Sequence, residues 1–445
     1  MIQREAPDDT ALVLHPDFGG SDILRIEARL EEAAGLAEAL GLRVVDVRSE
    51  PVRKLEPSTL FGRGKVETLR AEIETREAKV AVLDCELSPV QQRNLERAWN
   101  VKVIDRTGLI LEIFADRAQT REGRLQVELA RLSYERSRLV RTWTHLERQR
   151  GGRGFLAGPG ETQIETDRRL LAERMAKLRR ELEEVKRTRE LHRKRRRAAP
   201  WPTVALVGYT NAGKSTLFNR LARAKVMAKD MPFATLDPTM RAIRTPAGRK
   251  VLLSDTVGFI TDLPTELIAA FRATLEEVRE ADILIHVRDV SDPDHEGRKA
   301  DVESVLNALE AGAEHGQTII EAWNKADRLA EEDRDDLKWR ARLPKRPGSP
   351  DVAVTSAMTG EGTDALLALL DLALAADDVM LRLRLDPEES EAMAWLHEHG
   401  EVIEERSDPE TGKLYVVARL NEPDAGRFRA RFGVAEIRKE RAPAG

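Results

Sequence analysis

A loop between an apolar run and an amphipathic run constrains the fold of this chain more than any other feature. The run TVALV precedes the loop and the run STLFNRLA overlaps its end, and the loop reads Gly208-Tyr209-Thr210-Asn211-Ala212-Gly213-Lys214-Ser215. A GxxxxGKS loop between a strand and a helix surrounds phosphates with backbone N–H groups, and the helix adds its positive N-terminal end. We therefore expect a P-loop, in which Lys214 reaches the β- and γ-phosphates of a nucleotide and the Ser215 hydroxyl ligates Mg²⁺.

Three further motifs lie at the ends of predicted strands. Asp255-Thr256-Val257-Gly258 ends KVLLSDT, where the carboxylate can hold Mg²⁺ through water and the Gly258 amide can meet the γ-phosphate. Asn324-Lys325-Ala326-Asp327 ends TIIEAWN, and Asp327 can accept hydrogen bonds from the N1–H and 2-amino groups that guanine has and adenine lacks. Ser356-Ala357-Met358 follows DVAVT and fits a segment whose backbone N–H contacts guanine O6. The four motifs in this order predict a guanine-nucleotide site.

The segment Phe233-Ala234-Thr235-Leu236-Asp237 lies between the first two motifs and has no helical period. A threonine here can place its hydroxyl on Mg²⁺ only while the γ-phosphate is present, which couples loop order to the nucleotide state. We favour Thr235 over Thr239 for this role, and the alternative is an ordinary turn at Asp237-Pro238. The expected metal ligands are Ser215 and Thr235, and the expected catalytic residues are Lys214, Thr235 and Gly258.

The residue after the Asp-Thr-x-Gly motif bears on catalysis. Many GTPases place a water-orienting glutamine there, whereas this chain has Phe259. Because an apolar ring cannot orient water by hydrogen bonding, we predict slow intrinsic GTP hydrolysis that rises when a partner reorders the loop. Asn211 is a candidate ligand for a monovalent cation such as K⁺, and a loop-shaping asparagine is the alternative.

Four regions of the chain have different patterns. Residues 1–118 alternate short apolar runs with amphipathic stretches, and residues 119–199 are charged and of helical period around a glycine-rich centre. Residues 200–376 alternate strands with helices, and residues 377–445 suit a helix-and-hairpin module. We predict an α/β protein: a P-loop GTPase domain preceded by a small α/β domain with a long helical hairpin and followed by a small α+β module.

The hairpin carries most of the charge asymmetry of the chain. The net charge is -5, yet residues 168–197 hold fourteen Arg and Lys against five Glu. A concentration of basic charge on one element favours contact with a polyanion, although a solvated coiled-coil spacer is the alternative. The exposed amides of the glycine-rich tip favour phosphate contact, and the candidate RNA contacts are Arg150, Gly151, Gly152, Arg153 and Gly154.

The composition of the chain indicates its cellular compartment. Apolar residues make up 41% and charged residues 34%, and no run approaches the roughly 18 to 20 apolar residues that span a bilayer. The N-terminus lacks the pattern of a secretory signal, and Cys85, the single cysteine, suits a buried thiol. We expect a cytoplasmic monomer that binds GTP and GDP, with peripheral membrane association left open.

The motifs GYTNAGKS, FATLDPT, DTVGF and NKAD, together with RQRGGRGFLAGPGETQIETDRR, resemble the HflX family of translational GTPases over about residues 11–376. The resemblance implies a GTPase that binds the large ribosomal subunit, directs its hairpin toward the peptidyl-transferase region and splits or rescues ribosomes. It also implies that residues 151–160 and the Arg-rich helix contact ribosomal RNA, and that Phe259 replaces glutamine. The C-terminal module is not shared by all members of the family.

Two other functions remain open at the level of sequence. The first is an ATP-dependent RNA-remodelling enzyme that uses the N-terminal domain, where Phe61-Gly62-Arg63-Gly64-Lys65 is the only local candidate site. A glycine turn that opens a helix explains those residues equally well. The second is a GTP-gated regulatory scaffold for a protein partner. Nucleotide preference distinguishes the leading hypothesis from the first alternative, and salt-sensitive RNA binding distinguishes it from the second.

Overall fold

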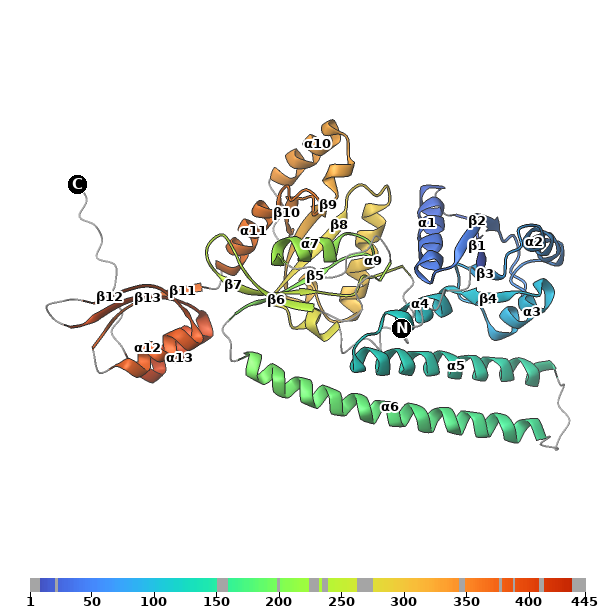
Figure 1. Ribbon diagram of the computed structural model, residues 1–445, viewed down its shortest axis with the longest axis horizontal. Coiled ribbons are helices and arrows are strands. Elements are labelled where there is room, and N and C mark those ends of the chain that lie inside the picture. Colours follow the sequence, from blue (N-terminus) through green and yellow to red (C-terminus); the bar gives the residue numbers. More distant parts are fainter. Residues whose placement is uncertain are drawn as a thin grey trace, which may run out of the picture.

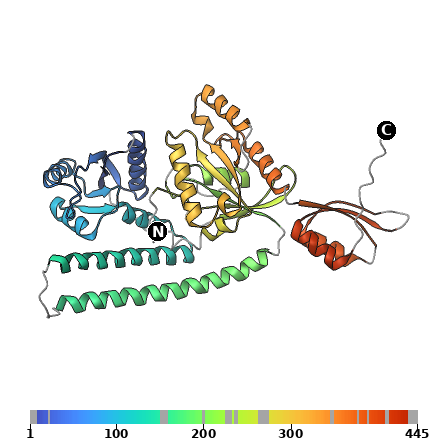
Figure 2. The same ribbon diagram turned by 180° about the vertical axis from the view of Figure 1, so that it is seen from behind.

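The structure is a computed structural model that describes residues 9–20, 23–149, 159–197, 201–223, 232–233, 239–261, 275–343, 349–375, 378–386, 389–407 and 412–433. The described residues form three sheets with their helices and one long helical hairpin (Figure 1). A domain with a six-stranded sheet, here called the G domain, lies between the N-terminal domain and the C-terminal module (Figures 1 and 2). None of the helices in these ranges combines the length and apolar character needed to cross a bilayer.

The N-terminal domain is a parallel four-stranded sheet with strand order β2-β1-β3-β4. Its strands are β1 Thr10–Asp17, β2 Arg43–Pro51, β3 Val80–Leu83 and β4 Lys102–Asp105, and its helices are α1 Ile23–Ala39, α2 Arg63–Thr75, α3 Pro89–Trp99 and α4 Arg106–Arg117. Apolar side chains of α1 and α4 pack on one face of the sheet and those of α2 and α3 on the other. Burial of β3 on both faces explains its continuous apolar sequence.

The hairpin consists of α5 Arg121–Gln149 and α6 Pro159–Arg197, which lie side by side beneath the N-terminal domain (Figures 1 and 2). Leu125, Leu132, Met175, Leu178 and Leu182 form the apolar seam between the two helices. The second helix begins with Pro159 in its first turn, where a missing backbone N–H costs no hydrogen bond. Gly160 therefore belongs to α6, whereas the sequence placed it in the tip.

A buried carboxylate fastens the hairpin to the N-terminal sheet. Asp105, at the end of β4, is 1% exposed and caps α4 by accepting from the Gly108 N–H at 2.8 Å. The same carboxylate accepts from the Tyr134 hydroxyl at 2.7 Å and pairs with Arg138 Nη1 at 3.1 Å, both from α5. Side chains from the middle of α5 thus fasten this helix to the end of β4.

The G domain has a six-stranded sheet of order β10-β9-β8-β5-β7-β6. Its strands are β5 Thr203–Val207, β6 Thr239–Arg244, β7 Lys250–Asp255, β8 Ile283–Asp289, β9 Thr318–Asn324 and β10 Asp351–Val354. Its helices are α7 Lys214–Ala222, α9 His295–Ala308, α10 Glu331–Arg342 and α11 Thr363–Ala375, with short 3-10 helices at Ala313–His315 and Ala326–Arg328. All strands run parallel except β6, which pairs antiparallel with β7 at the sheet edge and was not predicted.

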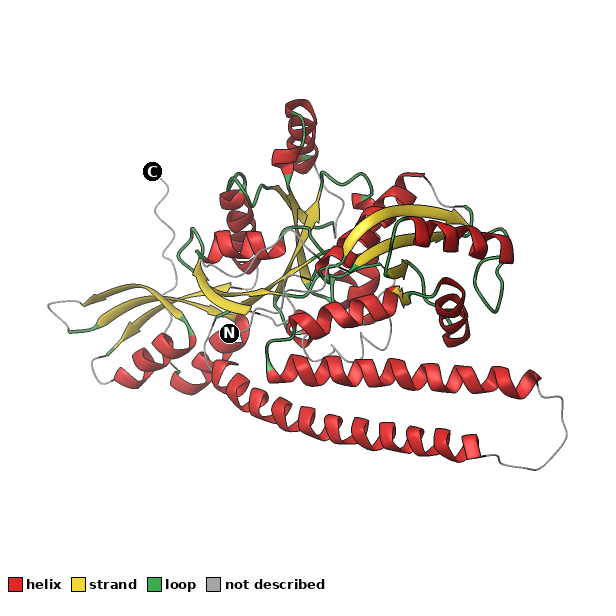
Figure 3. Cartoon of the chain, turned by 45° about the vertical axis from the view of Figure 1, so that its right-hand side comes forward, coloured by secondary structure: helices red, strands yellow, loops and turns green. Residues whose placement is uncertain are grey.

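The C-terminal module is an antiparallel sheet of order β11-β13-β12 with α12 and α13 on the same side (Figure 3). Its elements are β11 Asp378–Leu385, α12 Ser390–His399, β12 Glu401–Ser407, β13 Leu414–Asn421 and α13 Glu422–Phe432. Leu381, Leu383 and Leu385 of β11 point to the helices while Arg382 and Arg384 between them are exposed, as the alternation of a half-buried strand requires. The predicted fold class is confirmed for all four parts.

Candidate nucleotide-binding site

The predicted P-loop connects β5 to α7 at the centre of the six-stranded sheet. Gly208 has φ +150°, and a Cβ there would lie 2.2 Å from the Val287 carbonyl oxygen of the neighbouring strand. Gly213 has φ +95°, and a Cβ there would lie 2.3 Å from Asn324 Nδ2. Both glycines are therefore required by backbone conformation and by space. Asn211 is exposed and also left-handed, with φ +59°, which suits its predicted loop-shaping alternative.

Lys214 is buried at the first turn of α7. Its ammonium donates to the carbonyl oxygens of Gly208 at 3.0 Å and Tyr209 at 2.8 Å, so it lies inside the loop. Burial lowers the pKa of Lys214 to about 8, with Asp255 opposing the shift and Lys325 adding to it. A buried ammonium held by two carbonyl groups and near a carboxylate is poised to exchange these contacts for phosphate oxygens.

The Asp-Thr-x-Gly segment lies against the P-loop. Asp255 and Thr256 are buried, and the Thr256 hydroxyl donates to the Leu206 carbonyl oxygen at 2.5 Å. A Cβ at Gly258 would lie 2.9 Å from Thr210 Cα, so only glycine permits this approach. Phe259 is 2% exposed, and its backbone donates to the Gly208 carbonyl and accepts from the Thr210 N–H at 2.7 Å.

Asn324 joins the third and fourth motifs to the P-loop. Its Nδ2 donates to the Ala212 carbonyl oxygen at 2.8 Å, and its Oδ1 accepts from the Ala357 N–H at 2.9 Å. Ser356 and Ala357 are buried, whereas the Met358 side chain is exposed. The structure thus brings the motifs from three strand ends together.

Asp327 carries an acceptor that the described chain leaves unused. Its Oδ1 atom is buried and meets no hydrogen-bond donor among the described residues. A buried carboxylate oxygen without a donor is costly unless a ligand supplies one. The adjacent Ala326 is buried, and Lys325 has φ +63° with its ammonium 2.8 Å from Asp289 Oδ2. Asp289 was missed by the sequence analysis, although it also ends a strand.

Some predicted site residues lie outside the described residues. These are Ala234, Thr235, Leu236 and Asp237 of the segment after Phe233, and Arg150, Gly151, Gly152, Arg153 and Gly154 of the hairpin tip. Thr239 is described as the first residue of β6. The described ranges contain no cluster of three or more His, Cys, Asp or Glu side chains arranged to hold a metal ion.

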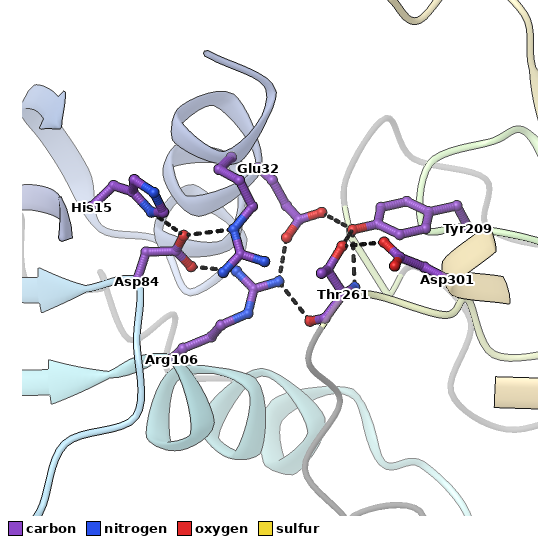
Figure 4. A network of polar contacts seen from close by, with 8 residues as sticks. His15, Glu32, Asp84, Arg106, Tyr209, Thr261 and Asp301 are labelled. Atoms are coloured by element: carbon purple, nitrogen blue, oxygen red, sulfur yellow. Dashed lines mark hydrogen bonds and ion pairs between the residues drawn. The ribbon is translucent and has the colours of Figure 1, made fainter. Parts of the chain in front are cut away.

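A buried polar network connects the P-loop to the N-terminal domain (Figure 4). The Tyr209 hydroxyl donates to Glu32 of α1 and accepts from the Thr261 N–H at 3.0 Å, and the Thr261 hydroxyl donates to Asp301 at 2.7 Å. Arg106 donates to the Thr261 carbonyl at 2.9 Å and forms ion pairs with Glu32 and Asp84.

Asp84 and Tyr209 occupy opposite ends of this network. Asp84 also contacts His15 at 2.9 Å and Arg29 at 3.2 Å. Despite its burial, the pKa of Asp84 is lowered by Arg106, His15 and Arg29, so it stays ionised. Burial and the Glu32 carboxylate raise the pKa of Tyr209 above its usual range, so the hydroxyl keeps its proton. Sequence reasoning missed this network because its members lie in separate regions of the chain.

An apolar contact accompanies the polar network. The ring of Phe233 is 2% exposed and packs edge-on against Phe114 of α4, with ring centroids 4.5 Å apart. Pro232 lies beside Gly35 of α1, where an added Cβ would be 3.7 Å away. Pro232 and Phe233 therefore pack on the N-terminal domain.

The candidate ATP site in the N-terminal domain has a structural explanation. Phe61 is buried, and Gly62 is the N-cap of α2 with the ordinary φ of -63°. The Lys65 ammonium pairs with Glu50 at 2.6 Å. The segment is the glycine turn that opens a helix, and its lysine is already engaged.

Comparisons with known proteins agree with this geometry. The family profile described as GTP-binding GTPase N-terminal matches residues 27–115, the GTPase middle region matches 117–196, 50S ribosome-binding GTPase matches 203–325, and the HflX C-terminal domain matches 343–442. GTPase HflX of Magnetococcus marinus is 49% identical over 415 residues, covering 93% of each chain, and GTPase HflX of Escherichia coli K12 is 42% identical, covering 94% of this chain and 95% of the relative.

One solved structure is also similar to this chain. A GTP-binding protein from Sulfolobus solfataricus in complex with GDP is 25% identical, covers 83% of this chain and 99% of its own, and gives a TM-score of 0.43.

The fold and the four assembled motifs define a P-loop GTPase. Profiles for successive regions match from residue 27 to residue 442, and two relatives are more than 40% identical over nearly the whole chain. The chain belongs to the HflX family of GTPases. The family resemblance extends beyond residue 376, since the C-terminal module matches the HflX C-terminal domain.

Proposed function

We propose that this chain is a Mg²⁺-dependent GTP hydrolase that binds the large ribosomal subunit and couples its nucleotide cycle to ribosome splitting or rescue. The observation that carries the guanine part is the buried Asp327 oxygen, which meets no donor among the described residues and lies in the same motif as Asn324. The N1–H and 2-amino groups of guanine supply the missing donors, and adenine offers none in that place.

The roles that we propose for the site residues are those of the P-loop motifs in which they occur. Gly208 to Ser215 enclose the phosphates, Lys214 neutralises the β- and γ-phosphates, and the Ser215 and Thr235 hydroxyls hold Mg²⁺, with Asp255 binding through water. Oxygen atoms of hydroxyl and phosphate groups are ligands that Mg²⁺ prefers. The bound Mg²⁺ neutralises charge on the phosphates.

Slow intrinsic hydrolysis follows from Phe259. Its ring is buried and its backbone is bonded to Gly208 and Thr210, so it presents no polar group to a nucleophilic water. We propose that a partner positions the loops that carry Thr235 and Gly258 for hydrolysis. The exposed Asn211 is a candidate ligand for K⁺.

The hairpin supports a ribosomal partner. It extends beneath the N-terminal domain as two long helices, and residues 168–197 carry fourteen basic residues against five glutamates (Figure 1). We propose that residues 150–154 and α6 contact ribosomal RNA through phosphates, in a cytoplasmic monomer. Such binding weakens steeply with salt, because each neutralised phosphate releases counterions.

The test measures GTP hydrolysis with and without purified large ribosomal subunits, for the wild type and a variant that lacks residues 151–160. Strong stimulation of the wild type that disappears in the deletion variant supports the proposal. Equal rates with and without subunits would overturn the ribosomal part and leave a guanine-nucleotide switch with another partner. A matched ATP assay checks the base preference.

A further inference from the structure

The carboxylate of Asp289 is fixed at both oxygens at the end of β8. Its Oδ1 accepts hydrogen bonds from the backbone N–H of Ser291 at 3.0 Å and from the Ser291 hydroxyl at 2.6 Å. Its Oδ2 lies 2.8 Å from the Lys325 ammonium. The two side chains are only 13% and 12% exposed, so the ion pair is largely shielded from water.

This ion pair lies within a set of contacts that reaches the P-loop. The Val290 N–H donates to the Asn324 carbonyl at 3.0 Å, which joins the end of β8 to the end of β9. Asn324 in turn donates to the Ala212 carbonyl at 2.8 Å. The residue between Asn324 and the buried Ala326 is Lys325, so its ammonium and its backbone are both held beside the guanine motif.

Lys325 has features that require a tether. Its backbone is left-handed, with φ +63°, a conformation that is unfavourable for a residue other than glycine. Its ammonium lies at the end of a long side chain, and the fixed Asp289 carboxylate selects one position for that side chain.

We propose that Asp289 is a positioning residue for the guanine-nucleotide site, acting through Lys325 to hold the Asn324–Asp327 segment ready for the base. The inference rests on the proposed guanine site and adds a residue from a different strand. Asp289 does not contact the nucleotide itself in this arrangement. Without the Asp289 carboxylate, Lys325 can leave its position. The Asn324–Asp327 segment must then be ordered when the nucleotide binds, and the free energy of that ordering weakens the binding.

The first experiment compares GDP binding by the wild type, Asp289→Asn and a matched control. Asp371→Asn is the control, because Asp371 is 12% exposed and contacts Arg249, Thr245 and Ala247, at the end of the β6–β7 pair opposite to Asp255. Isothermal titration calorimetry with GDP and Mg²⁺ is expected to show about tenfold weaker binding for Asp289→Asn, equivalent to about 1.4 kcal/mol. The control should stay within twofold of the wild type.

A double-mutant cycle separates positioning from general loosening. If Asp289 acts through Lys325, Asp289→Asn adds no further loss of GDP affinity in a Lys325→Met background. The melting temperatures of the nucleotide-free variants are measured alongside. If Asp289→Asn only loosens the protein, it weakens GDP binding by the same factor in the wild-type and the Lys325→Met backgrounds. That result would overturn the inference, whether or not Asp289→Asn also lowers the melting temperature.

The outcomes also distinguish this inference from the proposed function. A wild type that fails to bind GDP would overturn the guanine site, and the inference with it. A wild type that binds GDP beside an Asp289→Asn variant of equal affinity would overturn the role of Asp289 alone.

Discussion

The hydroxyl of Tyr209 in the P-loop donates a hydrogen bond to the carboxylate of Glu32 in α1 of the N-terminal domain. Glu32 is also the counter-ion of Arg106, and Arg106 donates to the Thr261 carbonyl two residues after Phe259. The phosphate-binding loop, the segment after Asp-Thr-x-Gly and the N-terminal sheet therefore share one buried polar network. Its members depend on one another, since removal of one leaves others without a partner.

Replacement of Arg106 by Met should strongly destabilise the chain. Arg106 is 3% exposed and neutralises both Glu32 and Asp84, so the variant leaves two buried carboxylates short of positive charge. We expect a loss of about 3–5 kcal/mol in the free energy of unfolding, the range for breaking a buried ion pair. Urea denaturation measures it. Arg63→Met serves as the control, because the Arg63–Glu67 pair is exposed. A loss below about 1 kcal/mol for Arg106→Met would contradict the prediction.

GDP binding should weaken above pH 8. Lys214 has a pKa of about 8 before nucleotide binds, and phosphates bind its protonated form. Protonation is nearly complete at pH 7 and falls to about one tenth at pH 9, so the dissociation constant should rise about tenfold over that interval. Binding titrations at several pH values measure how steeply the logarithm of the GDP dissociation constant rises with pH. Lys214→Ala supplies the control, since it retains the titration of GDP itself; equal slopes in both proteins would exclude Lys214 as the titrating group.

Substitution of Gly208 by Ala should disrupt the P-loop. The added methyl would lie 2.2 Å from the Val287 carbonyl oxygen, at φ +150°, so the loop or β8 must shift. We expect a loss of about 1–3 kcal/mol in stability together with weaker GDP binding. Gly426→Ala is the matched control: it lies in α13 with no atom within 4 Å of the new methyl, and helix propensity should stabilise it by up to about 1 kcal/mol. Thermal melts of both variants test the contrast, and similar melts would refute it.

Asp327→Asn should change the base preference. The buried Asp327 oxygen matches two donors of guanine, and an amide in its place brings its own donors toward them. GDP affinity should fall by at least about 2 kcal/mol, as for other truncated buried charge contacts. Xanthosine diphosphate, which carries an oxygen in place of the 2-amino group, should bind the variant better than GDP does. Unchanged GDP affinity would remove Asp327 from the base contact.

Local patterns predicted most of the fold. The alternation of apolar runs predicted both parallel sheets, and the helical period with its glycine-rich interruption predicted α5 and α6. The edge strand β6 was missed, because only one of the three apolar side chains in Thr239–Arg244, that of Ile243, is buried. Its strand form comes from antiparallel pairing with β7, which is a tertiary effect.

Some residues of the site could also be predicted from local patterns, whereas others depend on tertiary contacts. Gly208 to Ser215 could be found because their spacing reflects local backbone demands of the loop, such as the positive φ of Gly213. The assembly of the motifs was expected, and the contacts of Asn324 with Ala212 and Ala357 agree with it. Glu32 and Arg106 could not be found, since ordinary charged residues in helices give no local sign of a distant partner. The role of Thr235 stays a prediction.

Because α5 is fastened to the N-terminal sheet at Asp105, the helix acts as a lever that moves with the sheet. Tyr134 and Arg138 bind this carboxylate, and α5 continues eleven residues from Arg138 to Gln149, or about 16 Å at 1.5 Å per residue. A tilt of the N-terminal sheet by about 5° would therefore carry the far end of α5 by about 1.4 Å, with no change inside the helix. Arg106, the next residue after Asp105, is also the one that contacts Thr261, so the fulcrum of this lever adjoins the G domain.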